Sequence, residues 1–446
     1  MMKNAEAVKV ESLLKQKEKY LQDKSNTILR HALSQTVISQ VARTQDRVSE
    51  IDFSFSKEVK TMSATDQKRS GRCWIFAATN VLREIIAKKL GLKEFELSQS
   101  YIAFYDKLEK INFELEGIID LLDRDHDDRT LTWLLDSAIG DGGQWDMFAE
   151  LVKKYGVVPK NVFPETFQSS NTHVMSTLVD TELRKFAGKA KELNKTKGLA
   201  AVREEKNKLY AKIVNLFYSS YGLPPEKFDF EYVDKDGNYH LEKDFTPKSF
   251  FDKYVGEEVN DFVSIINAPT VDKPYGKTYT IDYLGNVVGG KPITHLNVTM
   301  DRMIELILSQ LNDDEIVWFG SDVSYYGDRE KGVWDDKSYD YQTPFELDFS
   351  ADKALALDYG ISTMNHAMCI VGVNLQNGVP TKWKIENSWG SENGKKGFYI
   401  MSDTWFKQYT YQAVVHKKYL TDEEKKAYEA EPIHLAPWDP FGSLAD

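Results

Sequence analysis

Three patterns in the sequence predict an α+β protein, with a helical half followed by an antiparallel β half. Apolar residues recur at helical spacing soon after residue 70. A longer and highly charged helical pattern covers residues 180–217 and predicts an insertion. The last third of the chain alternates apolar and polar residues, as half-buried strands do. We therefore expect a large helical insertion between the two halves and a C-terminal arm after the second.

The composition is that of a globular protein. Its 446 residues are 41% hydrophobic and 28% charged, which is enough for a large core. Apolar runs stay well short of the roughly 18 residues of a membrane span, and the first residues lack the apolar segment of a secretory signal. We therefore expect a cytoplasmic protein without a membrane partner. Two cysteines exclude a disulfide framework and a cysteine-rich metal site, and the net charge of -12 argues against a protein dedicated to nucleic acid.

The patterns divide the chain into five parts. The first is a helical and extended segment that contributes to assembly, and the second is the helical half. A helical insertion with a small β piece follows, then the β half, then the C-terminal arm. The five ranges are 1–60, 61–160, 161–290, 291–420 and 421–446.

Cys73 stands just before an amphipathic run. Residues such as Ile75 and Leu82 predict a helix that Gly91 ends. Cys73 would then lie at the helix N-terminus, where the peptide dipoles favour an anion. A thiolate is such an anion, and its pKa falls below about 8.5 in that setting. A small buried apolar residue is the alternative, because a free cysteine is usually that.

The other elements are predicted from the same two periodicities. We expect helices over 10–45 and 299–312, and a further helix that Ser98 caps. A short buried strand is expected over 315–320. A four-stranded antiparallel meander is expected over 366–373, 383–387, 397–401 and 411–415.

Residues 432–446 combine prolines with apolar side chains. Pro432, Pro437 and Pro440 exclude a helix across this stretch. Side chains such as Trp438 and Phe441 are too apolar for a disordered tail. We therefore expect the tail to lie extended against another part of the protein.

Four polar residues together suit nucleophilic catalysis. A cysteine nucleophile needs a base, a group that orients the base, and donors for the oxyanion. His366 opens a predicted strand and can be the base, and Asn387 can orient its imidazole through the side-chain oxygen. Gln67 can donate an amide N–H to the oxyanion, beside the backbone N–H of Cys73.

This order of Gln, Cys, His and Asn resembles the papain-like cysteine peptidases. Gln67 precedes the cysteine at that family's spacing, and Trp74 follows it. Trp389 belongs to an Asn-Ser-Trp-Gly motif, in which the family's tryptophan shields the His–Asn hydrogen bond from water. Gly142 and Gly143 match the family's glycine pair, whose backbone binds an extended substrate. The resemblance implies a papain-like fold, in which a helical half packs against an antiparallel β-barrel half.

Departures from papain itself resemble the bleomycin hydrolase / aminopeptidase C family, on its bacterial branch. His366 lies far beyond Cys73, Arg72 precedes the nucleophile, and both the Gly-Asp-Gly-Gly-Gln-Trp run and the C-terminal Ala-Pro-Trp-Asp-Pro segment match. The resemblance covers essentially the whole chain and implies an intracellular homohexamer with active sites facing an internal channel. It also implies that the C-terminal arm lies in the cleft. The terminal carboxylate, here that of Asp446, or of Ala445 if the last residue is removed, would pair with the free α-amino group of the substrate.

The resemblance thus implies a thiol aminopeptidase that releases N-terminal residues from peptides through an acyl-enzyme. This chemistry requires no metal and no organic cofactor. An open-cleft endopeptidase is one alternative, which shares the catalytic residues and differs in where the tail lies. An oligomeric nucleic-acid-binding assembly is another. It rests on residues 180–212, where Lys and Arg outnumber Asp and Glu, and it requires binding that falls steeply with salt.

Overall fold

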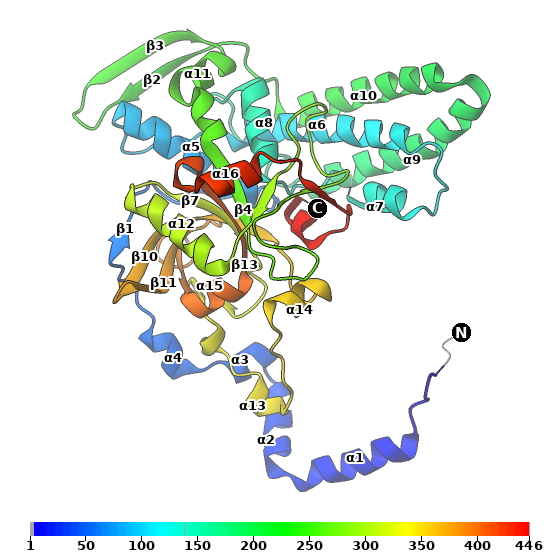
Figure 1. Ribbon diagram of the computed structural model, residues 1–446, viewed down its shortest axis with the longest axis vertical. Coiled ribbons are helices and arrows are strands. Elements are labelled where there is room, and N and C mark those ends of the chain that lie inside the picture. Colours follow the sequence, from blue (N-terminus) through cyan, green and yellow to red (C-terminus); the bar gives the residue numbers. More distant parts are fainter. Residues whose placement is uncertain (1–3, 138, 446) are drawn as a thin grey trace. The chain divides into compact units, whose positions relative to one another are not determined.

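The computed structural model describes residues 4–137 and 139–445 (Figure 1). The chain forms two compact units. The smaller unit comprises the residues up to Asp52 together with Asp335–Ala351, and the larger unit comprises Phe53–Trp334 together with the residues from Asp352 on. Within the described ranges, every helix is too short or too polar to cross a membrane.

The smaller unit is built from short helices. The helix predicted over 10–45 is divided, because Asp23 caps a new helix by accepting a hydrogen bond from the backbone N–H of Ser25 at 2.8 Å. An ion pair between Arg47 and Asp335 at 3.1 Å joins the two segments of the unit. The elements are α1 (Val10–Gln22), α2 (Lys24–Leu33), α3 (Ile38–Ala42), α4 (Gln45–Glu50), η2 (Asp336–Ser338) and α13 (Gln342–Phe345).

The helical half of the larger unit contains four helices. They are α5 (Cys73–Leu90), α6 (Gln99–Asp120), α7 (Arg129–Ser137) and α8 (Trp145–Tyr155). The predicted helix after Cys73 is confirmed, and Gly91 ends it in the left-handed conformation that glycine adopts without strain. The predicted cap of the second helix is confirmed too, since the Ser98 hydroxyl accepts from the backbone N–H of Tyr101.

Two long helices, α9 (His173–Lys197) and α10 (Leu199–Tyr221), follow and run side by side (Figure 1). The single helical pattern predicted over 180–217 is therefore two helices. The break falls at Gly198, whose φ of 78° suits glycine and strains other residues. A hairpin and short helices complete this region: β2 (Phe228–Val233), β3 (Tyr239–Phe245), α11 (Pro247–Tyr254) and η1 (Gly256–Asp261).

A 12-stranded sheet forms the β half, in the order β14-β5-β6-β4-β13-β7-β10-β11-β12-β9-β8, with β1 pairing to β10. The strands are β1 (Lys57–Glu58), β4 (Phe262–Ile266), β5 (Thr278–Ile281), β6 (His295–Asn297), β7 (Val317–Ser321), β8 (Gly327–Asp328), β9 (Val333–Trp334), β10 (His366–Gln376), β11 (Val379–Glu386), β12 (Phe398–Ser402), β13 (Thr410–His416) and β14 (Ile433–Leu435). Shorter elements connect them: α12 (Met300–Asn312), α14 (Lys353–Asp358), α15 (Asp403–Tyr409), η3 (Lys417–Tyr419), α16 (Asp422–Tyr428) and η4 (Pro440–Ala445).

The α+β class is confirmed, but the sheet differs from the predicted meander in two respects. Helix α15 carries the chain away from β12, so β13 pairs with β7 and β4 instead of extending the meander. Three pairs, β12 with β9, β4 with β6 and β14 with β5, are parallel, so the sheet is mixed. Periodicity predicts strands but not which strands are neighbours.

The packing of α5 on β10 brings the two halves together. Cys369 of β10 donates its thiol hydrogen to the carbonyl of Ala77 at 3.2 Å, and the indole N–H of Trp318 in β7 donates to the carbonyl of Trp74 at 3.2 Å. The first turn of α5 is therefore fixed against the first residues of β10. The five-part division of the chain stays a prediction. Strands β4 and β5 lie in the range expected to be the insertion, and both join the large sheet.

Candidate active site

Cys73 is the first residue of α5 and is only 4% exposed. The backbone N–H of Ala367 donates to its Sγ atom at 3.4 Å, and the thiol faces the carbonyl of Gly71 at 3.9 Å. Ala367 is the residue after His366. The structure therefore places Cys73 beside the first residues of β10, where His366 lies, although Cys73 and His366 are far apart in the sequence.

Burial controls the ionisation of both groups. It raises the pKa of the Cys73 thiol to about 11, although the backbone N–H groups of Ala367, Trp74 and Cys73 itself act in the opposite direction. The expectation of a lowered thiol pKa was thus wrong for this geometry, because desolvation outweighs the helix N-terminus. Burial likewise lowers the pKa of His366 to about 4, although the hydrogen bond that the imidazole donates to Asn387 acts in the opposite direction. Each group alone resists becoming charged.

Asn387 fixes the orientation of the His366 ring. Its Oδ1 atom lies 2.9 Å from His366 Nε2 and accepts a second hydrogen bond from the backbone N–H of Ser388 at 2.8 Å. The indole of Trp389 stacks on the imidazole, with ring centroids 4.7 Å apart. The guanidinium of Arg329 lies 4.5 Å from the centroid of the Trp389 ring. Nε2 is thereby engaged by Asn387, and Trp389 keeps that hydrogen bond away from solvent.

Gln67 is tied to the same motif by two hydrogen bonds. Its backbone N–H donates to the carbonyl of Ser388 at 2.8 Å, and its Oε1 atom accepts from the Ser388 hydroxyl at 2.6 Å. Its Nε2 atom donates to the carbonyl of Ser70 at 2.6 Å, which leaves one of the two amide hydrogens for another acceptor. The orientation of the Gln67 amide is therefore set before any substrate binds.

Every carbonyl of loop 139–142 accepts a hydrogen bond from a buried side chain. Lys107 Nζ donates to the first two carbonyls at 2.6 and 3.1 Å, and Lys110 Nζ donates to the second at 3.0 Å and also to the fourth. Trp74 Nε1 donates to the third at 2.7 Å. Both lysines belong to α6 and are at most 5% exposed. The loop is thus held by its carbonyls.

The N–H of Gly143 bonds to the protein's own C-terminal tail, donating to the carbonyl of Leu444 at 2.9 Å. A Cβ atom at Gly142 would lie 2.2 Å from that same carbonyl oxygen, and one at Gly143 would overlap the Trp74 indole. No larger residue therefore fits at either position. The backbone that packs against the glycine pair is therefore that of the tail, and binding of an extended substrate there stays a prediction.

The tail is extended only in part. Residues of β14 pair with β5, and Pro440 then begins the 3-10 helix η4, a first-turn position at which proline is tolerated. The expectation of no helix was therefore wrong beyond Pro440. Two further bonds anchor this end: the Ser443 hydroxyl donates to the carbonyl of Met364 at 2.7 Å, and the Gln144 amide donates to the carbonyl of Phe441 at 3.1 Å. Asp446, the expected carboxylate anchor, lies outside the described residues.

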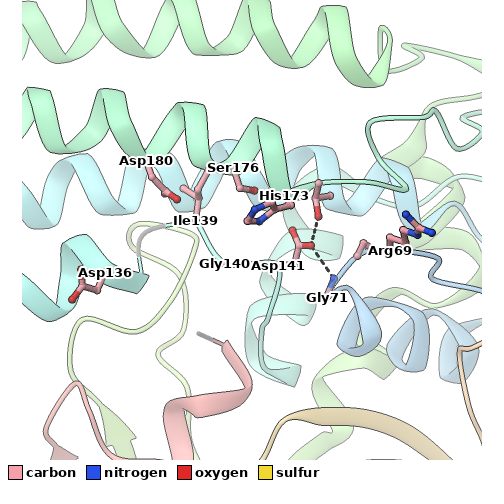
Figure 2. Close-up of a pocket in the computed structure, with 11 residues that line it drawn as sticks. Arg69, Gly71, Asp136, Ile139, Gly140, Asp141, His173, Ser176 and Asp180 are labelled. Carbon is pink, nitrogen blue, oxygen red and sulfur yellow. Dashed lines mark hydrogen bonds between the residues drawn. The ribbon is translucent and has the colours of Figure 1, made fainter. Parts of the chain in front are cut away.

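A polar cavity of about 350 Å³ opens beside the residues that precede Cys73 (Figure 2). Asp141 forms part of its wall and bonds to the backbone N–H of Gly71 at 2.8 Å. The ammonium of Lys107, 2.7 Å away, helps to keep the pKa of Asp141 well below its usual range, although burial acts in the opposite direction. The cavity is lined by Arg69, Ser70, Gly71, Asp136, Ile139, Gly140, Asp141, Thr172, His173, Ser176 and Asp180.

Comparison with known proteins identifies the family. The family model described as "Peptidase C1-like family" matches residues 7–442. The chain belongs to the Peptidase C1-like family. Aminopeptidase C from Lactobacillus delbrueckii subsp. lactis is 50% identical over 90% of each chain, and aminopeptidase C from Listeria monocytogenes is 44% identical over 91% of this chain and 92% of its own. The crystal structure of PepW from Lactobacillus rhamnosis HN001 superposes with a TM-score of 0.95 at 43% identity, covering 98% of this chain and 99% of that one.

Membership of this family establishes the papain-like fold that the motifs predicted. Sequence reasoning missed the two buried lysines of α6 and the role of Ser388 in holding Gln67. The lysines carry a signal in retrospect. Lys107 and Lys110 are one helical turn apart on a helix that also buries Asp106, Glu109 and Glu114 among its apolar residues. Such a pair indicates buried acceptors, but not which loop supplies them.

Proposed function

We propose that the protein is a cysteine aminopeptidase in which Cys73 is the nucleophile, His366 the acid and base, and Asn387 the residue that orients the imidazole. One observation carries this proposal: the backbone N–H of Ala367, the residue after His366, donates to Cys73 Sγ, while Leu444 of the protein's own tail accepts from the N–H of Gly143. A catalytic pair with one side of its cleft filled suits removal of residues from a peptide end.

The thiol proton moves to His366 as Sγ attacks the scissile carbonyl. Burial opposes either charge alone, but a thiolate and an imidazolium in contact compensate each other. Because Nε2 faces Asn387, the other ring nitrogen, Nδ1, exchanges the proton. The free amide hydrogen of Gln67 and the backbone N–H of Cys73 stabilise the oxyanion, and one such donor contributes about 3 kcal/mol.

Collapse of the tetrahedral intermediate that carries the oxyanion breaks the peptide bond. The imidazolium gives its proton to the leaving amine, and a thioester joins the substrate's acyl group to Cys73. Water then attacks the thioester and passes a proton to His366, which returns it to the sulfur as the acid leaves. Trp389 protects the His366–Asn387 hydrogen bond throughout, since its ring covers the imidazole.

The tail acts as a wall in this proposal. Leu444 and Ala445 are buried against Gly142, where the family's substrates run in extended form. A peptide therefore reaches Cys73 with few residues on its amino-terminal side. The terminal carboxylate of Asp446 would meet the free α-amino group. An open-cleft endopeptidase is disfavoured because the same backbone groups are occupied.

The nucleic-acid alternative gains no support from the helices on which it rested. Several cations of α9 and α10 face carboxylates: Lys185 pairs with Glu182 at 2.6 Å, and Lys189 pairs with Glu205 at 2.6 Å. Arg203 is engaged by Glu116. Cations paired in this way present little of the positive field that phosphates require.

A cytoplasmic homohexamer is part of the proposal, through the family resemblance. One feature of the smaller unit supports self-assembly. Helix α1 buries none of its side chains, and four of its apolar side chains are exposed: Val10, Leu13, Leu14 and Leu21. An exposed apolar stripe on an amphipathic helix marks a surface for a partner. Light scattering on the purified protein measures the number of chains, and a monomer at micromolar concentration would contradict this part.

The activity is tested by comparing a fluorogenic leucyl amide with its N-acetylated form, in buffer containing thiol. We expect rapid hydrolysis of the free amine only, and complete loss after treatment with iodoacetamide. The variant Cys73→Ala is the matched control, because it removes the sulfur and leaves the cleft. Equal hydrolysis of both substrates would favour the endopeptidase, and hydrolysis that survives in Cys73→Ala would overturn the assignment of the nucleophile.

A further inference from the structure

A buried ion pair joins the helix of the nucleophile to the strand of the asparagine. Arg83 of α5 donates to Oε1 of Glu386 at 2.6 Å, and Asn80 of α5 donates to the same oxygen at 2.7 Å. All three side chains are at most 2% exposed. Glu386 is the last residue of β11 and immediately precedes Asn387. Two donors from one helix therefore hold the backbone next to the orienting residue.

The same two donors reach the segment that leads to Gln67. Arg83 also donates to the carbonyl of Ser63 at 3.1 Å, and the Asn80 amide lies 3.5 Å from the Thr65 hydroxyl. Ser63 and Thr65 stand four and two residues before Gln67. The approach to the oxyanion donor thus depends on the same pair of side chains.

The strand of His366 is attached through the sheet. Cys369 in β10 is the register partner of Glu386 in β11, three residues after His366. The thiol of Cys369 in turn donates to Ala77 of α5. One buried cluster, Asn80–Arg83–Glu386, therefore contacts or adjoins every segment that carries a proposed catalytic residue.

We propose that Arg83 and Glu386 are positioning residues for the reaction, which set the distance between Cys73 on α5 and the His366–Asn387 pair on β10 and β11. The inference rests on the proposed function for the identity of the catalytic residues. Asn80 assists by sharing the Glu386 oxygen. None of the three acts on the substrate.

The chemistry of the cluster favours positioning over simple stability. A buried ion pair contributes little net stability, because desolvation offsets the attraction, but it fixes geometry through short directed bonds. Burial raises the pKa of Glu386 to about 7, against the opposing charges of Arg83 and Lys384 and with Glu84 adding to the rise. The hydrogen bonds to Oε1 hold best when the carboxylate is charged, so the geometry is tightest above that pH.

Two variants test the inference. Arg83→Lys keeps the charge but loses the forked geometry, and Arg83→Met combined with Glu386→Gln replaces the pair by neutral side chains of similar size, which buried sites commonly tolerate. For the double variant we expect kcat to fall about 10- to 100-fold with KM within about 2-fold, since a misplacement of the order of an ångström costs that much. Arg83→Lys should recover part of kcat.

A second readout does not depend on the substrate. The rate of Cys73 alkylation by iodoacetamide, measured from pH 5 to 9, reports how well His366 accepts the thiol proton. We expect the double variant to need higher pH for the same rate. Glu58→Gln is the matched control, because it breaks the ion pair between Glu58 of β1 and Lys384, which shares β11 with Glu386, and Glu58 lies outside α5.

The outcomes separate the two proposals. If the wild type cleaves no aminoacyl amide, the proposed function fails, while the alkylation profile still tests the positioning. If the folded double variant keeps the wild-type kcat and alkylation profile, the positioning role is overturned. The same holds if Glu58→Gln lowers kcat equally, because a general loss of stability would then explain both. Circular dichroism and thermal melting confirm that each variant is folded.

Discussion

Two regions of the larger unit are rich in charge, and they use it in opposite ways. At the junction of α5, β10 and β11, Arg83 and Glu386 are almost fully buried and bonded at 2.6 Å. Along α9 the Lys185 and Glu182 side chains are 65% and 44% exposed, although their ion-pair distance is also 2.6 Å. The same ion-pair distance therefore has different energetic consequences at the two sites. Water screens the exposed pair, whereas burial shields the pair of Arg83 and Glu386 from water.

The comparison predicts that polar groups matter at the junction in proportion to their burial. Cys73 and His366 are the extreme case, since burial raises the pKa of the thiol and lowers the pKa of the imidazole, and both shifts favour the neutral form of the group. Changes at the junction should therefore be large and specific. Changes on α9 should be small and sensitive to salt.

The largest expected effect is that of His366→Ala on the reactivity of the thiol. A thiol with a pKa of about 11 is almost entirely protonated at pH 7, and its thiolate fraction grows tenfold for each pH unit up to that value. In the proposed mechanism the imidazole of the wild type accepts the proton, so alkylation by iodoacetamide should be fast near neutral pH. In the variant we expect a loss of about 100-fold or more at pH 7, recovered progressively at alkaline pH.

Mass spectrometry of the alkylated protein provides this measurement, and it also separates Cys73 from Cys369. Cys369 is the internal control, because burial raises its pKa well above the ordinary value and its thiol is engaged by Ala77. A variant that reacts as fast as the wild type at pH 7 would show that the thiol ionises without His366.

The second prediction asks whether the tail prevents longer peptide chains from entering the cleft. Phe441 and Leu444 are buried, and Leu444 bonds to Gly143 beside Trp74. Ending the chain after Asp439 removes these groups and frees the N–H of Gly143. We expect hydrolysis of N-acetylated peptides to appear at a rate comparable to that of the free amine, because longer chains then reach the cleft.

Peptide mapping of an acetylated substrate by mass spectrometry measures this gain. The substitution Leu444→Gly is the milder companion, since it keeps the backbone carbonyl and removes the apolar side chain. Continued restriction to free amines in the truncated protein would show that the tail does not define the end of the cleft.

Much of the site could be predicted from the sequence, because its residues lie in local motifs. Cys73 at a helix start, His366 at a strand start and Asn387 before Trp389 each have a signature within a few residues. The structure places them as those signatures imply. The roles assigned to them stay predictions until they are measured.

What the sequence did not predict depends on contacts between distant segments. The raised pKa of Cys73 follows from burial by other elements, which helix position alone does not indicate. The place of β13 between β7 and β4 follows from the crossing of α15. The ion pair of Arg83 and Glu386 joins residues in different halves of the chain. Neither Arg83 nor Glu386 lies in a local sequence pattern that predicts its partner.

The third prediction concerns Lys110, which is buried but lies outside the catalytic junction. Lys110→Met removes the side-chain donor to the carbonyl of Gly142 and one of the two donors to the carbonyl of Gly140. Leaving a buried acceptor unpaired costs about 1–3 kcal/mol, and loop 139–142 should lose its fixed shape. We expect KM for peptides to rise about 10-fold, which corresponds to a free-energy cost in the lower half of that range of about 1–3 kcal/mol. The change in kcat should be smaller.

Steady-state kinetics on a series of leucyl peptides measure this split. Lys153→Met is the control, because Lys153 forms a partly exposed pair with Glu150 on α8. An unchanged KM in a folded Lys110→Met variant would contradict the idea that the carbonyls hold the loop.

The smallest expected effect belongs to the exposed pair, and it is the sharpest test of the comparison. Lys185→Gln removes a charge at the same ion-pair distance as that of Arg83 and Glu386. Because both side chains face water, the free energy of unfolding should change by less than about 0.5 kcal/mol. The difference should vanish at high salt, where exposed charges are screened. Urea unfolding at low and at 1 M salt measures it, with kcat and KM expected to stay at wild-type values. A loss as large as that of a buried partner would mean that distance, rather than burial, governs these charges.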